Sequence, residues 1–259
     1  MRRGFALLAV LWVIVALSAI VGLGVGAVRL GQMTSANRVF LTRGRWAAEA
    51  CLAIAETRSS AHRLGDTATV DLGRVTHCAW RVDDPTARLN VNTTPVSVLE
   101  QLADQLGVPP ALMDTLVLHR PYQDTAQVRV VLTPDPRPLP FLTTDGPGTI
   151  NANAASAAVL HVIPGLGPQA VEALAEARRL GQPIRSLDQL VSAAPGDRPA
   201  LLGHYADLAA LLTFSPPQLL VTATGWVEGV GGPDGLHATI DELVVPLPDR
   251  LAVIRRRMW

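Results

Sequence analysis

The chain begins with a long apolar segment and then changes its pattern. Residues 5–28 contain no ionisable side chain. As one helix, this segment is long enough to cross the roughly 30 Å hydrocarbon core of a bilayer. Only Met1, two arginines and Gly4 precede it. The pattern therefore predicts a single transmembrane helix that tethers the chain to a membrane.

Beyond the apolar segment, polar residues become more frequent while apolar residues recur at helical spacing. The recurring residues are Val39, Trp46, Ala47, Ala50, Cys51, Ile54 and Ala55. Spacings of three and four place such residues on one face of a helix. We expect the membrane helix to continue to about Arg63, with this apolar stripe on a sheet and the arginine-bearing face in water.

Alternating or clustered apolar residues predict strands on both sides of a helical middle region. The predicted strands are residues 68–72, 75–82, 219–227, 237–245 and 251–258. The late strands have no sizeable helix of their own, so we expect them to complete the sheet that the first two begin. The middle of the chain, about 86–213, is then an inserted helical domain.

An internal repeat lies in this middle region. Asn90 and Asn92 recur 61 residues later as Asn151 and Asn153. In each copy a small or hydroxyl residue and then a helical pattern follow. Asparagine oxygens satisfy the first amides of helices, so we interpret these four residues as helix caps rather than as ligand-binding residues.

The repeat divides the insertion into two related units, about 88–123 and 149–212. A proline-rich loop over residues 124–148 is expected between them. In the second unit, Pro164, Gly165 and Gly167 form a turn that resembles a helix-hairpin-helix, in which glycines expose the amides of the next helix. The first unit has Gly107 followed by Val108 and two prolines, which predicts a degenerate hairpin. The second turn also matches a relaxed GxGxxA pattern, but no βαβ unit surrounds it, so we predict no dinucleotide site.

Two further features leave alternatives open. Ser18, Gly22 and Gly26 are four residues apart and line one face of the membrane helix, where another helix can approach closely. Ordinary tolerance of glycine in membrane helices explains them equally well. Cys51 and Cys78 either form a disulfide, if the domain lies outside the cytoplasm, or are two buried free thiols.

Composition and motifs argue against catalysis and against a general attraction to nucleic acid. The 22 basic residues are all arginine and balance 22 acidic residues. The chain has no HExxH, GxSxG, phosphate-loop or CxxC motif. Its six histidines have no metal-ligand spacing. We predict a non-enzymatic protein with no metal ligands assigned.

The first residues resemble a type IV prepilin leader, because a short basic segment ends in Gly4 and Phe5 opens the apolar helix. The resemblance implies that a prepilin peptidase cuts between Gly4 and Phe5 and that Phe5 is then N-methylated. An uncleaved anchor is the alternative. Ala9 stands where most pilins carry glutamate, a departure that is least costly for a subunit at the tip of a filament.

This interpretation places the amino terminus in the cytoplasm and the C-terminal domain in the periplasm, with a single pass through the bacterial inner membrane. Charge counting conflicts with it, because more arginines follow the apolar segment than precede it. The arginines that follow it are Arg29, Arg38, Arg43 and Arg45.

Several segments, taken in order, resemble the type II secretion system protein K (GspK) family of minor pseudopilins. Besides the leader, they are residues 46–50, 88–93 and 163–165 and the closing strands. The family implies an α+β, pilin-like fold, in which a long N-terminal helix packs on a small antiparallel sheet and a large all-α domain is inserted. The implied parts are leader 1–4, transmembrane helix 5–28, helix and first strands 29–85, insertion 86–213 and closing strands 214–259.

The resemblance implies a minor pseudopilin at the tip of the type II secretion pseudopilus, which initiates or caps the pseudopilus for protein export across the outer membrane. Implied partners are the I- and J-type minor pseudopilins, the major pseudopilin and the prepilin peptidase. The assembly platform, the secretin, the exported substrate and calcium follow from the same resemblance. The alternative is a membrane-anchored DNA receptor that uses the hairpin. It is disfavoured because residues 169–190 carry three arginines and three acids.

Overall fold

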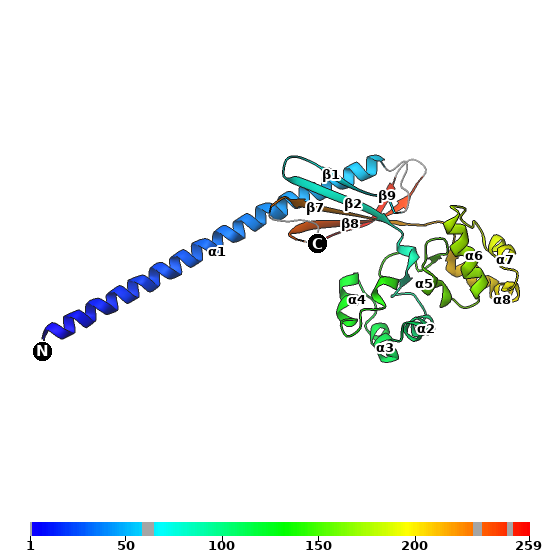
Figure 1. The fold of residues 1–259 in the computed structure, drawn as a ribbon, viewed down its shortest axis with the longest axis horizontal. Coiled ribbons are helices and arrows are strands. Elements are labelled where there is room, and N and C mark those ends of the chain that lie inside the picture. Colours follow the sequence, from blue (N-terminus) through cyan, green and yellow to red (C-terminus); the bar gives the residue numbers. More distant parts are fainter. Residues whose placement is uncertain (1, 59–64, 230–234, 248–250) are drawn as a thin grey trace.

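The computed structural model describes residues 2–58, 65–229, 235–247 and 251–259, with side chains described from residue 10 onward. Figure 1 shows three parts in a row: a long helical rod, a sheet against the end of the rod, and a group of short helices beyond the sheet. The fold is α+β with a long N-terminal helix and an antiparallel sheet, as the sequence predicts.

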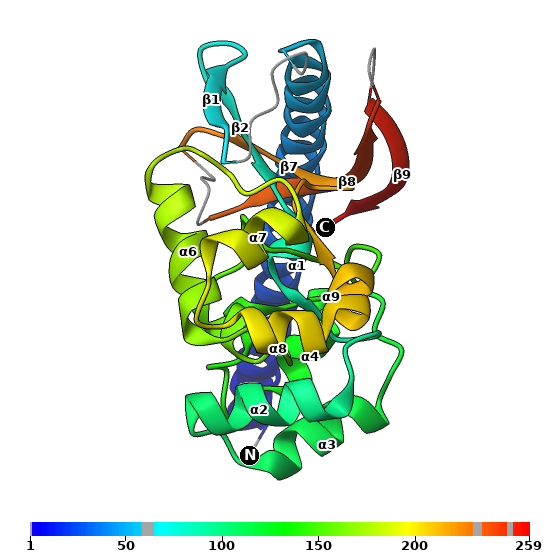
Figure 2. The ribbon, with the colours of Figure 1, turned by 90° about the vertical axis from the view of Figure 1, so that its right-hand side faces the viewer.

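The rod and the sheet are built from the two ends of the chain. Their elements are α1 (Arg2–Arg58), β1 (Thr67–Asp71), β2 (Thr76–Asp83), β7 (Leu219–Val227), β8 (His237–Pro246) and β9 (Leu251–Met258). The strand order is β1-β2-β7-β8-β9, and all neighbours are antiparallel. Figure 2 shows β1 and β9 at the two edges of this sheet, on either side of α1. The late strands therefore complete the sheet that the first hairpin begins.

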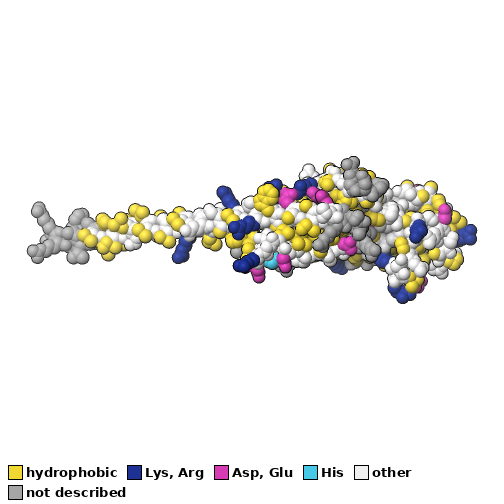
Figure 3. Space-filling view, turned by 90° about the horizontal axis from the view of Figure 1, so that it is seen from above, with side chains coloured by type: hydrophobic (Ala, Val, Ile, Leu, Met, Phe, Trp, Pro, Cys, Tyr) yellow, Lys and Arg dark blue, Asp and Glu magenta, His cyan; other side chains and the backbone are white. Residues whose placement is uncertain are grey.

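From residue 10 onward, helix α1 is exposed along its apolar part and buried only where it meets the sheet. Trp12 is 67% exposed and Leu23 is 76% exposed. Among the described residues, α1 is the one helix long and apolar enough to cross a membrane. Figure 3 shows hydrophobic and uncharged side chains along the outer part of the rod and arginines nearer the sheet.

The buried stripe of α1 consists of small residues and one leucine, and it differs from the predicted stripe. Its members are Gly44, Ala47, Ala48, Cys51, Leu52 and Ala55. Trp46 is 70% exposed and Val39 is 50% exposed, so their predicted place on the sheet was wrong. The face of α1 that packs on the sheet does not include these large residues, because the helix lies too close to the sheet to accommodate their side chains.

Two glycines set this close approach. A Cβ on Gly225 of β7 would lie 2.1 Å from the carbonyl oxygen of Gly44 and 2.5 Å from the amide nitrogen of Ala48. A Cβ on Gly44 would lie 2.8 Å from the carbonyl oxygen of Gly225. Backbone thus meets backbone at the crossing of α1 and β7, which only glycine allows.

The helical insertion lies between β2 and β7 and has a core separate from that of the sheet. Its elements are η2 (Pro85–Ala87), β3 (Leu89–Asn90), α2 (Val96–Leu106), α3 (Pro110–Leu118), α4 (Thr125–Val131), η3 (Leu139–Phe141), β4 (Leu142–Thr143), β5 (Ile150–Asn151), α5 (Ala157–His161), α6 (Pro168–Arg179), α7 (Leu187–Ala193), α8 (Arg198–Gly203), α9 (Tyr205–Leu211) and β6 (Leu212–Thr213).

Two units repeat within the insertion. Each is closed by a two-residue parallel ladder, β3 with β4 in the first unit and β5 with β6 in the second. The first unit therefore extends to Thr143, beyond the predicted end near residue 123. The predicted loop over 124–148 was wrong in part, because it contains α4, whose first turn is capped by Asp124 accepting from the amide of Gln127 at 2.8 Å.

We predict that Gly225→Ala destabilises the protein by about 1–3 kcal/mol, because the new methyl group forces α1 away from β7. Thermal unfolding of the detergent-solubilised chain, followed by circular dichroism, measures the change. Gly73→Ala is the matched control, since no heavy atom lies within 4 Å of its Cβ position. Equal unfolding temperatures for the two variants would contradict the prediction.

Candidate functional site

The predicted processing and packing residues lie on the free part of α1. Gly4 and Phe5 fall within the first turns of this helix, and cleavage between them stays a prediction. Ser18, Gly22 and Gly26 are exposed, and no heavy atom lies within 4 Å of a Cβ built on either glycine. The described chain thus leaves this face open, as a helix–helix contact would require.

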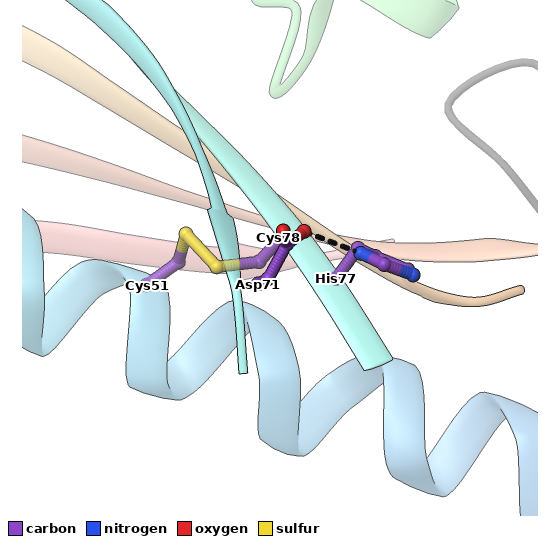
Figure 4. Close-up of a disulfide and its surroundings, with 4 residues drawn as sticks. All are labelled: Cys51, Asp71, His77 and Cys78. Atoms are coloured by element: carbon purple, nitrogen blue, oxygen red, sulfur yellow. Dashed lines mark hydrogen bonds and ion pairs between the residues drawn. A yellow bond between two sulfur atoms is a disulfide. The ribbon is translucent and has the colours of Figure 1, made fainter. Parts of the chain in front are cut away.

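Cys51 of α1 and Cys78 of β2 form a disulfide, with Cα atoms 6.0 Å apart (Figure 4). Of the two alternatives left open by the sequence, the structure has the bonded one. Both residues are fully buried. The bond joins α1 to the sheet beside the glycine crossing, because Cys78 pairs with Gly225 in the β2–β7 ladder.

A histidine beside this disulfide joins the first hairpin to β7. The Nδ1 atom of His77 lies 2.7 Å from Oδ1 of Asp71, and its ring stacks on Trp226. The hydrogen bond to Asp71 raises the pKa of His77, and Glu228 acts in the same direction. Both carboxylates are exposed, so we interpret the contacts of His77 with Asp71 and Glu228 as surface ion pairs.

The four repeat asparagines do not cap helices, so that prediction was wrong. Helix α2 begins after Pro95, and α5 is capped by Ser156, whose Oγ accepts from the amide of Val159 at 3.3 Å. The asparagines tie distant backbone segments together instead. A buried carboxamide both donates and accepts, so it can pair with an amide and a carbonyl at once.

The same hydrogen bonds occur in both units. Asn92 donates to the carbonyl of Tyr122 at 2.9 Å and accepts from its amide at 2.7 Å. Asn153 donates to the carbonyl of Ile184 at 2.7 Å and accepts from its amide at 3.1 Å. Asn90 and Asn151 each accept from the amide two residues later. The sequence repeat is therefore a structural duplication.

The glycine turn of the second unit is filled by the chain itself. Gly165 has φ +87°, and a Cβ there would lie 2.6 Å from Cβ of His204. A Cβ on Gly167 would lie 2.3 Å from the carboxyl group of Asp197. Oδ2 of Asp197 accepts from the amide of Ala170 at 2.7 Å, at the start of α6. A carboxylate already occupies the place that a DNA phosphate would take in a helix-hairpin-helix.

Polar and charged contacts fix the insertion to the linker that follows β2 and to strand β9. After β2, Oδ2 of Asp84 accepts from Nδ2 of Asn151 at 2.6 Å. Between the units, Asp145 is 4% exposed and pairs with Arg257 of β9 at 2.8 Å and with Arg255. These contacts hold the two parts of the molecule in one relative orientation.

A second charged group lies where α1 crosses the outer strands. Glu242 of β8 is 5% exposed and lies 3.3 Å from Nε of Arg256, which also pairs with Glu49 of α1. Burial raises the pKa of Glu242, and the neighbouring carboxyls of Glu56 and Glu49 raise it further, against the opposing effect of Arg256.

No metal site emerges from the described residues. Nowhere among them do three or more histidine, cysteine, aspartate or glutamate side chains gather in a way that could hold an ion. His62, one of the six scattered histidines, lies outside the described residues. The calcium implied by the family resemblance therefore stays a prediction without a ligand set.

Comparisons with known proteins match the fold. No protein-family model matches the chain, and no curated protein sequence matches it. Among solved structures, the chain is similar to a chain in the crystal structure of the GspK-GspI-GspJ complex from the enterotoxigenic Escherichia coli type 2 secretion system. The TM-score is 0.55 at 16% identity, and the match covers 90% of this chain and 99% of that one. The likeness covers most of both chains, and it shows a shared fold.

We predict that removing the disulfide, as Cys51→Ala with Cys78→Ala, lowers the free energy of unfolding by about 2–4 kcal/mol, because the unfolded chain gains freedom. Thermal unfolding in detergent measures the loss. Adding a reductant to the wild type should produce a similar drop and leave the double variant unchanged. A wild type that is indifferent to reductant would contradict the prediction.

We predict that Glu242→Gln is close to the wild type in stability near pH 4 and unfolds roughly 2 °C higher at pH 8. The raised pKa means that the protonated carboxyl stabilises the fold below the unfolded pKa and that this contribution is lost as the pH rises through the folded pKa. Glutamine keeps the neutral state at every pH.

The control for this pH series is Glu100→Gln, a change at an exposed residue of α2. Its unfolding temperature should follow that of the wild type across the range. If Glu242→Gln were less stable than the wild type at pH 8, the attraction of Arg256 would outweigh the burial of the charge, and the prediction would fail.

Proposed function

We propose that this chain is a minor pseudopilin of the type II secretion system, a non-enzymatic subunit at the tip of the pseudopilus. The single observation that carries the proposal is the arrangement of the chain. One uninterrupted helix runs from a free apolar half onto a sheet, and that sheet is interrupted by a bulky helical insertion (Figure 1). The fold of this chain is similar to that of a chain in a GspK-GspI-GspJ complex, over 90% of this chain and 99% of that one.

The free half of α1 supports the assembly role. It is apolar on every side, and none of its most hydrophobic 18-residue window is buried within the chain. Lipid tails can surround such a helix in the membrane, and sister helices can replace them in a filament at little cost. The open face of Ser18, Gly22 and Gly26 offers the close approach that such packing uses.

The insertion supports a place at the tip. It lies beyond the sheet, at the end of the molecule opposite to the membrane helix (Figure 1). A subunit repeated along a filament would need room for this bulk at every step, whereas a terminal subunit needs it once. Ala9 fits the same place, because a terminal subunit has no further amino terminus above it to neutralise.

The proposal includes partners and a location. We infer that the chain associates with I- and J-type minor pseudopilins and with the major pseudopilin, after a prepilin peptidase has cut between Gly4 and Phe5. The assembly platform, the secretin and the exported substrate are its further proposed contacts. The C-terminal domain lies in the periplasm of a bacterium, where the buried disulfide would be stable. There the subunit would initiate or cap the pseudopilus for export across the outer membrane.

The DNA-receptor alternative loses its structural basis at the hairpin. A phosphate bound at the start of α6 would have to displace Asp197, which accepts from the amide of Ala170. Further along that helix lie Glu172 and Glu176, the second of which pairs with Arg179. Like charges at this place disfavour a nucleic-acid backbone.

We predict that co-expression with an active prepilin peptidase yields a mature chain that begins with N-methylated Phe5, measured by intact mass and N-terminal peptide mass spectrometry. Gly4→Ala should retain residues 1–4, because the peptidase no longer finds its glycine. Gly22→Ala, in the same helix but away from the cut, is the matched control and should be processed as the wild type is.

The processed chain should also co-purify with I- and J-type minor pseudopilins from the same membranes. A chain that keeps Met1 beside an active peptidase, which processes a second pseudopilin in the same cells, would contradict the proposal.

A further inference from the structure

A cavity of about 290 Å³ lies at the seam between the sheet and the helical insertion. The linker after β2, helix α4, strand β8 and the end of β9 form its walls. In Figure 1 this seam lies between the C-terminal end of the chain and α4. The two parts of the molecule are held in one orientation here by Asp84 and Asp145, so the cavity is built in advance of any ligand.

The carboxylates around the cavity are already paired within the chain. Asp83 pairs with Arg81 at 2.6 Å, and Asp84 is held by the side chain of Asn151. Asp145 pairs with Arg255 and Arg257. Asp241 accepts from Oγ1 of Thr222 at 2.8 Å and from the indole nitrogen of Trp259 at 2.9 Å. Each of these carboxylates therefore has a partner within the chain, and among the described residues no three or more such side chains gather in a way that could hold a metal ion.

Two arginines in the wall have no such partner. Arg88 follows η2 and Arg129 lies in the last turn of α4, and both side chains are exposed at the cavity. Neither makes an ion pair or a side-chain hydrogen bond with any residue that the structure describes. A third guanidinium, that of Arg257, lies 5.4 Å from the ring centroid of Trp259 on the same wall. The cavity therefore offers donors that the chain itself does not satisfy.

We propose that this cavity binds a carboxylate group, presented by an acidic peptide segment or by a small free dicarboxylate. The planar fork of a guanidinium matches the two oxygens of a carboxylate. Leu220, Pro85 and the indole of Trp259 supply apolar surface for the aliphatic part of a glutamate side chain. The site goes beyond the proposed function and does not rest on it.

The neighbouring aspartates favour a carboxylate over a phosphate group. A phosphate monoester concentrates about −1.5 to −2 charge on one group at pH 7, whereas each carboxylate group carries one charge, and the second carboxylate of a dicarboxylate can lie away from the aspartates. Four aspartates line the cavity, and their repulsion of the ligand grows with its charge. Exposed arginines give weak binding, so a dissociation constant of about 1 mM is expected for a single carboxylate.

The test uses the full chain in a neutral detergent and saturation-transfer NMR of the ligand. The probes are the peptide acetyl-Ala-Glu-Ala-amide, its Gln counterpart, glutarate and inorganic phosphate. The Glu peptide should bind at least about fivefold more tightly than the Gln peptide, and more weakly as salt is raised. Arg88→Gln with Arg129→Gln should weaken its binding about tenfold or more.

The matched control is Arg74→Gln with Arg198→Gln, which removes the same charge at two exposed arginines away from the cavity. It should bind as the wild type does, and thermal unfolding should show that both double variants remain folded. Glutarate that binds as tightly as the Glu peptide assigns the cavity to a free carboxylate, and tighter binding of the peptide assigns it to a peptide segment.

Several results would overturn the proposal. If the Gln peptide bound as tightly as the Glu peptide, the carboxylate group would not be what the cavity recognises. Equal binding of the Glu peptide by the two double variants would show that Arg88 and Arg129 do not contribute to binding. No binding of any probe up to about 20 mM, or phosphate displacing the Glu peptide at a lower concentration than glutarate does, would also refute it.

Discussion

The close contact between α1 and β7 is the constraint on which the rest of the structure depends. At Gly44 and Gly225 the helix backbone touches the strand backbone, so the face of α1 on the sheet must consist mainly of small residues. The disulfide between Cys51 and Cys78 and the pairing of Glu49 with Arg256 fix the same crossing. The folded domain is therefore a rigid continuation of the free apolar half of α1, and a displacement of the helix moves the sheet with it.

The second constraint is the joining of strands from distant parts of the chain. Strand β2 ends at Asp83 and its neighbour β7 begins at Leu219, so the whole insertion must leave and re-enter the sheet at adjacent strands. Asp84, just after β2, then holds the second unit through Asn151, and Asp145, between the two units, pairs with Arg257 of β9. This fixed seam places a bulky body at the end of the molecule opposite to the N-terminal end of α1 (Figure 1).

The hairpin of the second unit illustrates how one distant residue changes the meaning of a local motif. Two glycines and the start of α6 supply amides that suit an anion. Asp197 occupies them, so the motif becomes an internal joint between α6 and the segment before α8. In contrast, Arg88 and Arg129 belong to no sequence motif, yet the fold places them in the wall of a cavity without an ion-pair partner among the described residues.

The sequence by itself determined the elements and their order. The long helix, the five strands, the insertion and its repeat all follow from periods of two, of about 3.6 and of 61 residues, which are properties of the chain alone. Short helices with weak periodicity, such as α4, were missed. Only the tertiary structure decided the helix face on the sheet, the bridging role of the asparagines, the pairing of the cysteines and the cavity. Each of these depends on residues brought together from about 30 or more positions apart, and such contacts leave no local pattern to read.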